Sequence, residues 1–492
     1  MRGAILAIDQ GTTGTHSLLF DERGRVVGRG YRPFHQFYPK PGWVEHDPEE
    51  IWKTCLDVIG QALRGRRAKI AAIGITNQRE TTILWDRRTG KPLHRAIVWQ
   101  DRRTAPDCAR LRKAGALAEV RRRTGLLLDP YFSGTKLAWL LREIPGAKAT
   151  AHRGRLAFGT IDTWLIWKLT GGRSHVTDPT NASRTLLFNL ANREWDDSML
   201  RLLGVPRAVL PEVRPSAGEF GRTVSLGVLP AGVPVTGVAG DQQAALFGQG
   251  CVRSGEMKVT YGTGGFLLLQ TGPRLVRSRS GLLTTIACGS AGEATYALEG
   301  SVFIAGAAIQ WLRDELKLLK TAAESEVVAR SVPDTAGVHL VPAFTGLGAP
   351  WWDAGARGTI TGLTRGAGRA HLVRAALEAI AFQVADVVAA MRRDLGRPIR
   401  ALRVDGGACR NGLLMQFQSD LLDAALVRPK LIETTAAGAA GLAGLGVKLW
   451  TPSDLGRLHP VDRVFRPRMG AALRRERLAG WHLAVAQARL TI

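Results

Sequence analysis

One pattern constrains this sequence more than any other, and it occurs twice: an apolar segment enters a turn rich in Gly and Thr and leaves it as a second apolar segment. The first copy, GAILAI–DQGTTGT–HSLLFD, covers residues 3–21, and the second, GEMKVT–YGTGG–FLLLQT, covers residues 255–271. Short apolar runs separated by such turns predict β-hairpins. Unless the similarity is due to chance, the chain has two related α/β halves, with domains at residues 1–249 and 250–492.

Three further segments have helical patterns. Residues 47–63 begin with acidic positions and repeat their apolar residues at a spacing of about 3.6, which predicts an amphipathic helix. Residues 369–395 predict a long, mostly buried helix. Residues 434–446, TTAAGAAGLAGLG, are so rich in small side chains that we expect this segment to pack closely against another backbone.

Size and cysteine content narrow the class of protein. A chain of 492 residues is too long for one ordinary hydrophobic core, which agrees with two large domains. Its five cysteines are scattered, odd in number and without CxxC spacing, so we expect neither a disulfide framework nor a zinc site. No apolar run approaches the roughly 20 residues of a membrane span, and the N-terminal apolar stretch is too short for a signal peptide. We therefore expect a cytoplasmic protein without a membrane anchor.

The formal net charge of +25 raises the alternative of a nucleic-acid partner. The basic residues are dispersed, however, and the short clusters at 64–67, 121–123 and 474–477 have no interleaved aromatic residues. We interpret the charge as an arginine-rich surface, which still attracts anionic substrates such as nucleotides. A nucleic-acid partner is therefore not expected.

Residues 77–82, NQRETT, come one residue after the apolar run KIAAIGI, which predicts a buried strand. The strand thus delivers Arg79 and Glu80 side by side at its end. Charges that leave water are costly unless they are paired. Two interpretations remain: a surface turn, or a polar site at the carboxyl edge of a sheet, where open α/β folds bind ligands.

Three aspartates end predicted strands. Asp9 lies in the first Gly/Thr turn, Asp241 follows the small-residue strand VTGVAG, and Asp405 precedes two glycines and a helix that begins near Asn411. Each has a plain interpretation as a turn residue or a helix cap. Each also has a chemical interpretation. In it, the carboxylate of Asp9 holds Mg²⁺ through water, Asp241 is a base that accepts the proton of an alcohol, and the open turn after Asp405 receives a nucleotide.

The order hairpin, Asp-strand, Gly-Gly-helix resembles that of the actin-like ATPase superfamily. Within it, the chain resembles the FGGY carbohydrate kinase family over essentially its whole length. The stretches that carry this resemblance include residues 38–52, 71–82, 96–104, 131–140, 159–170, 176–189, 239–249, 280–289, 309–318 and 341–353. The resemblance implies an α/β fold of two ribonuclease-H-like, actin-like ATPase domains separated by an interdomain cleft.

The NQRETT segment is specific to one group within this family, because it resembles the members that phosphorylate glycerol to sn-glycerol 3-phosphate with ATP. The resemblance makes Asp241 the general base in an in-line phosphoryl transfer. It assigns the substrate contacts to Arg79, Glu80, Trp99, Tyr131, Asp241, Gln242 and Phe266. It assigns the nucleotide contacts to Thr12, Thr13, Gly14, His16, Thr263, Gly306, Gln310, Gly407 and Asn411. It also implies Mg²⁺ at Asp9, through water, and a homodimer or homotetramer.

One departure lies in the first hairpin, where many relatives have Ser-Ser-Arg and this chain has Gly14, Thr15 and His16. Since histidine is shorter and mostly neutral at pH 7, we expect weaker phosphate binding unless another arginine, such as Arg410, compensates. The segment RTVSLGVLPAGV lacks the fructose 1,6-bisphosphate loop of some bacterial relatives. The alternatives that remain are a kinase for another polyol or ketose and an ATPase switch that acts on protein partners.

Overall fold

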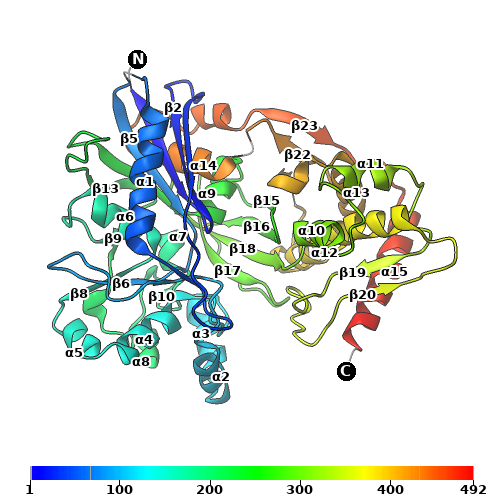
Figure 1. Ribbon diagram of the computed structural model, residues 1–492, viewed down its shortest axis with the longest axis horizontal. Coiled ribbons are helices and arrows are strands. Elements are labelled where there is room, and N and C mark those ends of the chain that lie inside the picture. Colours follow the sequence, from blue (N-terminus) through cyan, green and yellow to red (C-terminus); the bar gives the residue numbers. More distant parts are fainter. Residues whose placement is uncertain (1–2, 67, 400, 432, 491–492) are drawn as a thin grey trace.

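Two large β-sheets, one in each half of the chain, organise the computed structural model, which describes residues 3–66, 68–399, 401–431 and 433–490 (Figure 1). The first sheet has the order β13-β14-β5-β1-β2-β3 and the second has the order β17-β18-β16-β15-β21-β22-β23. The strands of the first sheet are β1 (Ala4–Gln10), β2 (Gly14–Phe20), β3 (Val26–Pro33), β5 (Ile70–Asn77), β13 (Ala217–Arg222) and β14 (Pro234–Gly240). Those of the second are β15 (Glu256–Tyr261), β16 (Gly265–Gly272), β17 (Leu283–Cys288), β18 (Ala294–Val302), β21 (Ala401–Asp405), β22 (Leu426–Pro429) and β23 (Val461–Phe465).

Both predicted hairpins are confirmed. β1 pairs antiparallel with β2 and parallel with β5, and β15 pairs in the same way with β16 and β21. The first turn is shorter than the predicted residues 9–15, because Asp9 pairs with His16 and Gln10 with Thr15. Only residues 11–13 remain in the turn, so Asp9 is held within a strand.

The apolar runs are continuous, rather than alternating, because helices cover both faces of the first sheet. Leu6 and Ile8 belong to the core shared with α1 (Pro48–Leu63) and α6 (Ile161–Leu169). Ile5 and Ala7 face the opposite way and pack with α14 (Thr434–Gly446). The predicted helix 47–63 is confirmed as α1, with Asp47 as its N-cap.

The small-residue helix α14 lies in sequence between β22 and β23 of the second sheet but packs on β14, β5 and β1 of the first (Figure 1). A Cβ atom added to Gly74 of β5 would lie 2.2 Å from the carbonyl oxygen of Ala439. The predicted close approach of backbones is therefore confirmed. The residues of the second half thus complete the layers of the first.

The remaining elements fall into two groups. Between β5 and β13 lie α2 (Ala105–Lys113), α3 (Leu117–Thr124), α4 (Ser133–Glu143), α5 (Ala147–His152), α7 (Pro179–Ala182), α8 (Asp197–Leu203) and the short strands β6 (Ile83–Asp86), β7 (Ala96–Ile97), β8 (Leu156–Gly159), β9 (Val176–Thr177), β10 (Phe188–Asn189), β11 (Glu194–Trp195) and β12 (Glu212–Val213). β4 (Glu45–His46) pairs with β7. The second sheet packs with α10 (Gly306–Asp314), α11 (Glu324–Arg330), α12 (Arg369–Leu395), α13 (Gly412–Leu422), α15 (Ala471–Arg489) and the pair β19 (His339–Val341) and β20 (Thr359–Thr361). α12 matches the predicted long buried helix.

α9 (Asp241–Gly248) ends the first half of the chain and leads into β15. The division at residues 249 and 250 stays a prediction. Within the described ranges, no helix is both long and apolar enough to cross a membrane.

Candidate active site

Predicted site residues from three neighbouring strands meet at the carboxyl edge of the first sheet. β1, β5 and β14 are parallel neighbours, with Asp9 opposite Thr76 and Gly240 opposite Asn77. Asp9, one residue before the end of β1, therefore lies beside the NQRETT segment that follows β5, and Asp241 begins α9 beside both. Residues 77–82 are buried, so the interpretation of this segment as a surface turn is wrong. Parallel topology places these groups where α/β sheets bind ligands.

The backbone at Glu80 is unusual. Its φ angle of 61° lies in the left-handed region, which a residue with a long side chain seldom adopts. The carbonyl oxygen of Glu80 accepts hydrogen bonds from Ser133 Oγ at 3.0 Å, Thr82 Oγ1 at 3.1 Å and Lys136 Nζ at 3.3 Å. Strained conformations of this kind persist where the surrounding structure holds them, and they cluster at functional sites.

Arg79 and Glu80 belong to a buried quartet of charges, together with Arg184 and Glu299. Glu299 accepts from Arg79 Nη1 at 2.7 Å and from Arg79 Nη2 at 3.0 Å. Arg184 donates from Nε to Glu80 at 2.6 Å and from Nη2 to Glu299 at 2.9 Å. All four side chains are at most 2% exposed, so alternating signs are what makes their burial tolerable.

The two carboxylates of the quartet differ in electrostatic environment. Burial acts to raise the pKa of Glu299, but Arg184 and Arg79 outweigh it and lower this pKa to about 2. Burial outweighs the same two arginines at Glu80, whose pKa is raised. The two arginines therefore hold Glu299 in its ionised form, whereas burial favours the protonated form of Glu80.

Aromatic residues lie beside this quartet of charges. Arg79 Nη2 donates to the hydroxyl of Tyr131 at 3.2 Å. The ring of Tyr131 meets that of Trp99 edge to face, with centroids 5.6 Å apart. Trp99 Nε1 in turn donates to Thr12 Oγ1 in the first hairpin turn at 2.9 Å. The predicted substrate residues and the first predicted phosphate turn are thereby joined.

Asp241 is the accessible acid of the cluster, since its side chain is 31% exposed and one carboxylate oxygen lies 3.3 Å from Arg79 Nε. Its helix is capped by Gly240, so Asp241 is not an N-cap residue. Asp9 is half-buried, and the burial of its carboxyl group, with the nearby carboxylate of Asp241, raises the pKa of Asp9 to about 7. A carboxylate that is both accessible and held near a guanidinium suits proton acceptance from a bound alcohol.

Lys258, on β15, was not predicted from the sequence. It is fully buried, and its ammonium group donates to Gln242 Oε1 and, at 2.7 Å, to Thr260 Oγ1. Burial lowers the pKa of Lys258 to about 8, although Asp405 and Asp241 oppose this effect. Because Lys258 occupies the oxygen of Gln242, the amide nitrogen of Gln242 remains as the donor toward a substrate. Phe266 lies opposite Thr260 on β16, half-buried.

The predicted nucleotide residues of the second half lie in the β15–β16 turn, in the first part of α10 and between β21 and α13. Thr263 is exposed in the β15–β16 turn, and the amide of Gly306, the first residue of α10, donates to the carbonyl of Gly262 at 3.0 Å. Gln310 lies one helical turn further along α10 and is exposed. β21 is the parallel neighbour of β15, so Gly407 and the α13 N-cap Asn411 reach the same edge.

His16 lies in β2 with its ring 4.4 Å from that of Tyr31. Burial, reinforced by Arg29 and opposed by Glu433, lowers the pKa of His16, so the ring is neutral at pH 7. Arg410 is exposed in the short 3₁₀ turn at residues 407–410 of the second half. Compensation by Arg410 stays a prediction.

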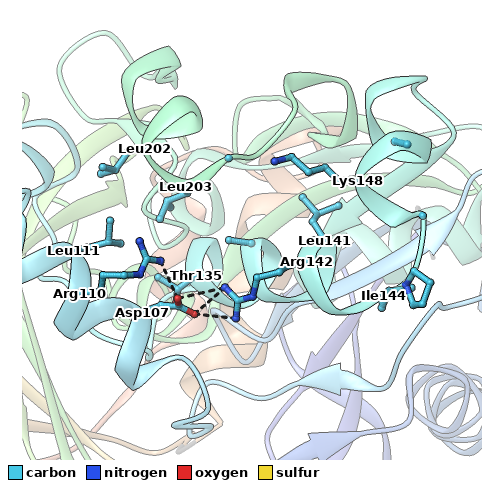
Figure 2. Close-up of a pocket in the computed structure, with 15 residues that line it drawn as sticks. Asp107, Arg110, Leu111, Thr135, Leu141, Arg142, Ile144, Lys148, Leu202 and Leu203 are labelled. Carbon is cyan, nitrogen blue, oxygen red and sulfur yellow. Dashed lines mark hydrogen bonds and ion pairs between the residues drawn. The ribbon is translucent and has the colours of Figure 1, made fainter.

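A separate cavity of about 550 Å³ lies between α2, α4, α5 and α8 (Figure 2). Asp107 points into it and pairs with both Arg110, at 2.9 Å, and Arg142, at 3.2 Å. None of the predicted site residues lines this cavity. It therefore adds nothing to the cluster around Arg79 and Asp241.

Known proteins resemble this chain over nearly its full length. The profile of the FGGY family of carbohydrate kinases, N-terminal domain, matches residues 4–248, and that of the C-terminal domain matches residues 257–447. The glycerol kinase of Acidovorax ebreus is 56% identical, covering 98% of this chain and 99% of that protein. That of Symbiobacterium thermophilum is 55% identical, covering 99% of each. The crystal structure of Plasmodium falciparum glycerol kinase with ADP matches with a TM-score of 0.95 and 39% identity, covering 100% of this chain and 99% of that one.

Proposed function

This chain belongs to the FGGY family of carbohydrate kinases, and we propose that it transfers the γ-phosphoryl group of ATP to a primary hydroxyl of glycerol, giving sn-glycerol 3-phosphate and ADP. The observation that carries the proposal is the position of Asp241, an accessible carboxylate 3.3 Å from Nε of Arg79, whose guanidinium also lies 3.6 Å from Glu80 and donates to Tyr131. A small triol offers donors and acceptors that such a set of charged and hydroxyl groups can engage. Trp99 supplies an apolar wall for its carbons.

Asp241 is the general base in this mechanism. The attacking hydroxyl oxygen forms a bond to the γ-phosphorus while the bond between that phosphorus and the bridging oxygen of ADP breaks, and the hydroxyl proton passes to Asp241. Arg79 keeps its position during the reaction, because Glu299 accepts hydrogen bonds from both of its terminal nitrogens. Its Nε edge remains beside Asp241, so the base and the substrate hydroxyl are positioned together.

The turns of the two hairpins contribute backbone amides to the phosphates. Thr12, Thr13 and Gly14 lie at the end of the first sheet, and Thr263 and Gly306 lie at the end of the second. Gly306 supports the second turn from α10, because its amide donates to the carbonyl oxygen of Gly262 and a Cβ atom at this position would lie 2.6 Å from that oxygen. Gly407 is open, with no atom within 4 Å of an added Cβ, and suits the base or ribose of the nucleotide.

The residues at the sheet edge fit Mg²⁺. Asp9 and Asp241 present carboxylate oxygens, the ligand type that this cation prefers. Burial and the nearness of Asp241 raise the pKa of Asp9 to about 7, so a divalent cation is favoured here because it offsets both effects. Asp9 would hold it through water, and when bound it supplies neutralisation of phosphate charge.

Assembly and location follow from the same resemblance. A homodimer or homotetramer in the cytoplasm stays our expectation. Size-exclusion chromatography with light scattering decides the assembly, since a mass near one chain would exclude both oligomers.

The test of the function is ADP release from Mg·ATP with and without glycerol, in the wild type and in Asp241→Asn. We expect turnover that depends on glycerol and is abolished by the substitution, while ADP binding measured by calorimetry persists. Turnover with xylulose or gluconate but not glycerol would assign another substrate. ADP release that ignores every polyol would replace the kinase with an ATPase switch.

A further inference from the structure

The chain passes between the two sheets three times, and the first two passages meet at one helix pair. α9 leads from the first sheet into β15, and α14 returns from β22 to the first sheet (Figure 1). The two helices are in backbone contact: a Cβ atom on Gly248 would lie 2.1 Å from the carbonyl oxygen of Thr434, and one on Gly438 would lie 1.9 Å from that of Ala244. The passages therefore form one tightly packed junction, rather than two independent linkers.

A single carboxylate from the second sheet binds both passages. One oxygen of Asp405, the last residue of β21, accepts a hydrogen bond from Gln249 Nε2 at 2.7 Å and another from Thr434 Oγ1. Gln249 directly follows α9, and Thr434 is the first residue of α14. All three side chains are buried. Movement of one half against the other thus changes the surroundings of Asp405.

Hydrogen bonding at this junction of α9 and α14 is incomplete. In the part of the chain that the structure describes, the second carboxylate oxygen of Asp405 and the amide oxygen of Gln249 are both buried without a hydrogen-bond partner. A buried acceptor without a donor is costly, which makes the arrangement sensitive to small shifts. Lys258, which holds Gln242 in the substrate pocket, is electrostatically coupled to Asp405 as well.

The predicted nucleotide turn begins at the next residue. Gly406 has a φ of 85°, and an added Cβ atom there would lie 2.4 Å from the carbonyl oxygen of Tyr261. The turn is therefore seated against the end of β15, from which the turn containing Thr263 starts. A nucleotide that orders Gly407 also fixes the backbone that carries Asp405.

We propose that Asp405 is a positioning residue that couples occupation of the nucleotide turn to the relative orientation of the two halves, so that nucleotide and glycerol bind cooperatively. The proposal rests on the function proposed above. In this proposal the hydrogen-bonded carboxylate of Asp405 links the nucleotide turn to the junction of α9 and α14, so that a shift in one displaces the other. Asp405 itself touches neither reacting atom.

Calorimetry on the full chain tests it with a non-hydrolysable ATP analogue, AMP-PNP, as the nucleotide probe. The ratio of its Kd without and with saturating glycerol gives the coupling factor. In the wild type we expect a factor of roughly 5 or more, the ordinary range for coupled sites. In Asp405→Asn, and independently in Thr434→Val, we expect the factor to fall to about 1 while each ligand alone still binds.

Asp462→Asn is the matched control, because this exposed aspartate pairs with Arg428 on the neighbouring strands β22 and β23 and does not touch the junction. Its coupling factor is expected to equal that of the wild type. A wild-type factor retained in Asp405→Asn and Thr434→Val, or lost equally in the control, overturns the proposal. A wild type that binds AMP-PNP but not glycerol overturns the proposed function instead, and this inference with it.

Discussion

Glu299 accepts hydrogen bonds from both terminal nitrogens of Arg79, although the two residues are 220 positions apart in sequence. Arg79 follows β5 in the first half, and Glu299 lies in β18 in the second. The substrate pocket proposed for the first half is thus held in shape by a carboxylate of the second. The shape of the proposed substrate site therefore depends on the contact between the two halves of the chain.

Removal of that carboxylate should destabilise the protein strongly. Glu299→Gln leaves Arg79 and Arg184 buried with one negative partner fewer, and breaking a buried ion pair costs roughly 3–5 kcal/mol. Urea unfolding measures the loss. The control is Glu219→Gln, because Glu219 pairs with Arg222 at the surface, where a pair contributes about 1 kcal/mol or less. Equal losses in the two variants would show that the quartet adds nothing special.

Lys136 should determine affinity for glycerol. Its buried ammonium group donates to the carbonyls of Tyr131, at 2.7 Å, and Glu80. Lys136→Met removes both bonds, and since a hydrogen bond to a charged group is worth about 1.5–3 kcal/mol, KM for glycerol should rise roughly tenfold or more. KM for ATP should stay constant in the same steady-state assay. Lys148→Met, at the cavity of Figure 2, is the control and should change neither KM. A rise confined to KM for ATP would contradict this role.

The replacement of His16 by arginine should strengthen nucleotide binding. His16 lies opposite Asp9 at the first hairpin, and its pKa is lowered by burial, so it carries no charge for a phosphate at pH 7. His16→Arg supplies a charge-assisted donor, and we expect the Kd of ADP, measured by calorimetry, to fall roughly tenfold. His35→Arg, at an exposed site where the histidine contacts Glu50, should leave it constant. An unchanged Kd in His16→Arg would mean that another cation already serves the phosphates.

The attachment of the last helix should weaken as the pH rises. His482 of α15 donates to Asp386 of α12 at 2.9 Å, and this hydrogen bond raises the pKa of His482 against the effect of partial burial. A histidine whose pKa is higher in the folded than in the unfolded state stabilises the fold fully below its unfolded pKa, which is near 6.5. This contribution to stability is lost as the pH rises through the folded pKa. The stability difference between wild type and His482→Gln should therefore be larger at about pH 6 than at about pH 9. A difference that grows with pH would reverse the assignment.

Acid should destabilise the protein through His175, which has the opposite sign. Burial, together with Arg87, lowers the pKa of His175 from 6.5 to about 4. The unfolded chain takes up the proton first, so stability falls as the pH drops from 6.5 toward 4, by about 3 kcal/mol in total. Urea unfolding across this range should show a shallower fall for His175→Gln than for wild type. The same slope in both proteins would exclude His175 as the acid-sensitive group.

Local sequence patterns were enough for the elements that depend on neighbouring residues. The two Gly/Thr hairpins, helix α1 with its acidic cap and the long helix α12 all follow from turn chemistry and apolar periodicity, because these act within a few residues. The small-residue segment at 434–446 also predicted its close packing. The short distance between backbones requires Gly and Ala, whatever the partner.

The partners themselves were decided only by the tertiary structure. Nothing near position 299 or 184 indicates that these charges enclose Arg79, and nothing near α14 indicates that it returns to the first sheet. A buried charge is stable beside an opposite charge from any part of the chain, so its pairing depends on how the strands are ordered in space and not on local spacing. By itself the sequence determined which segments are strands, helices and polar turns. The order of strands in the two sheets, which no local interaction encodes, decided which turns meet and therefore where the active site lies.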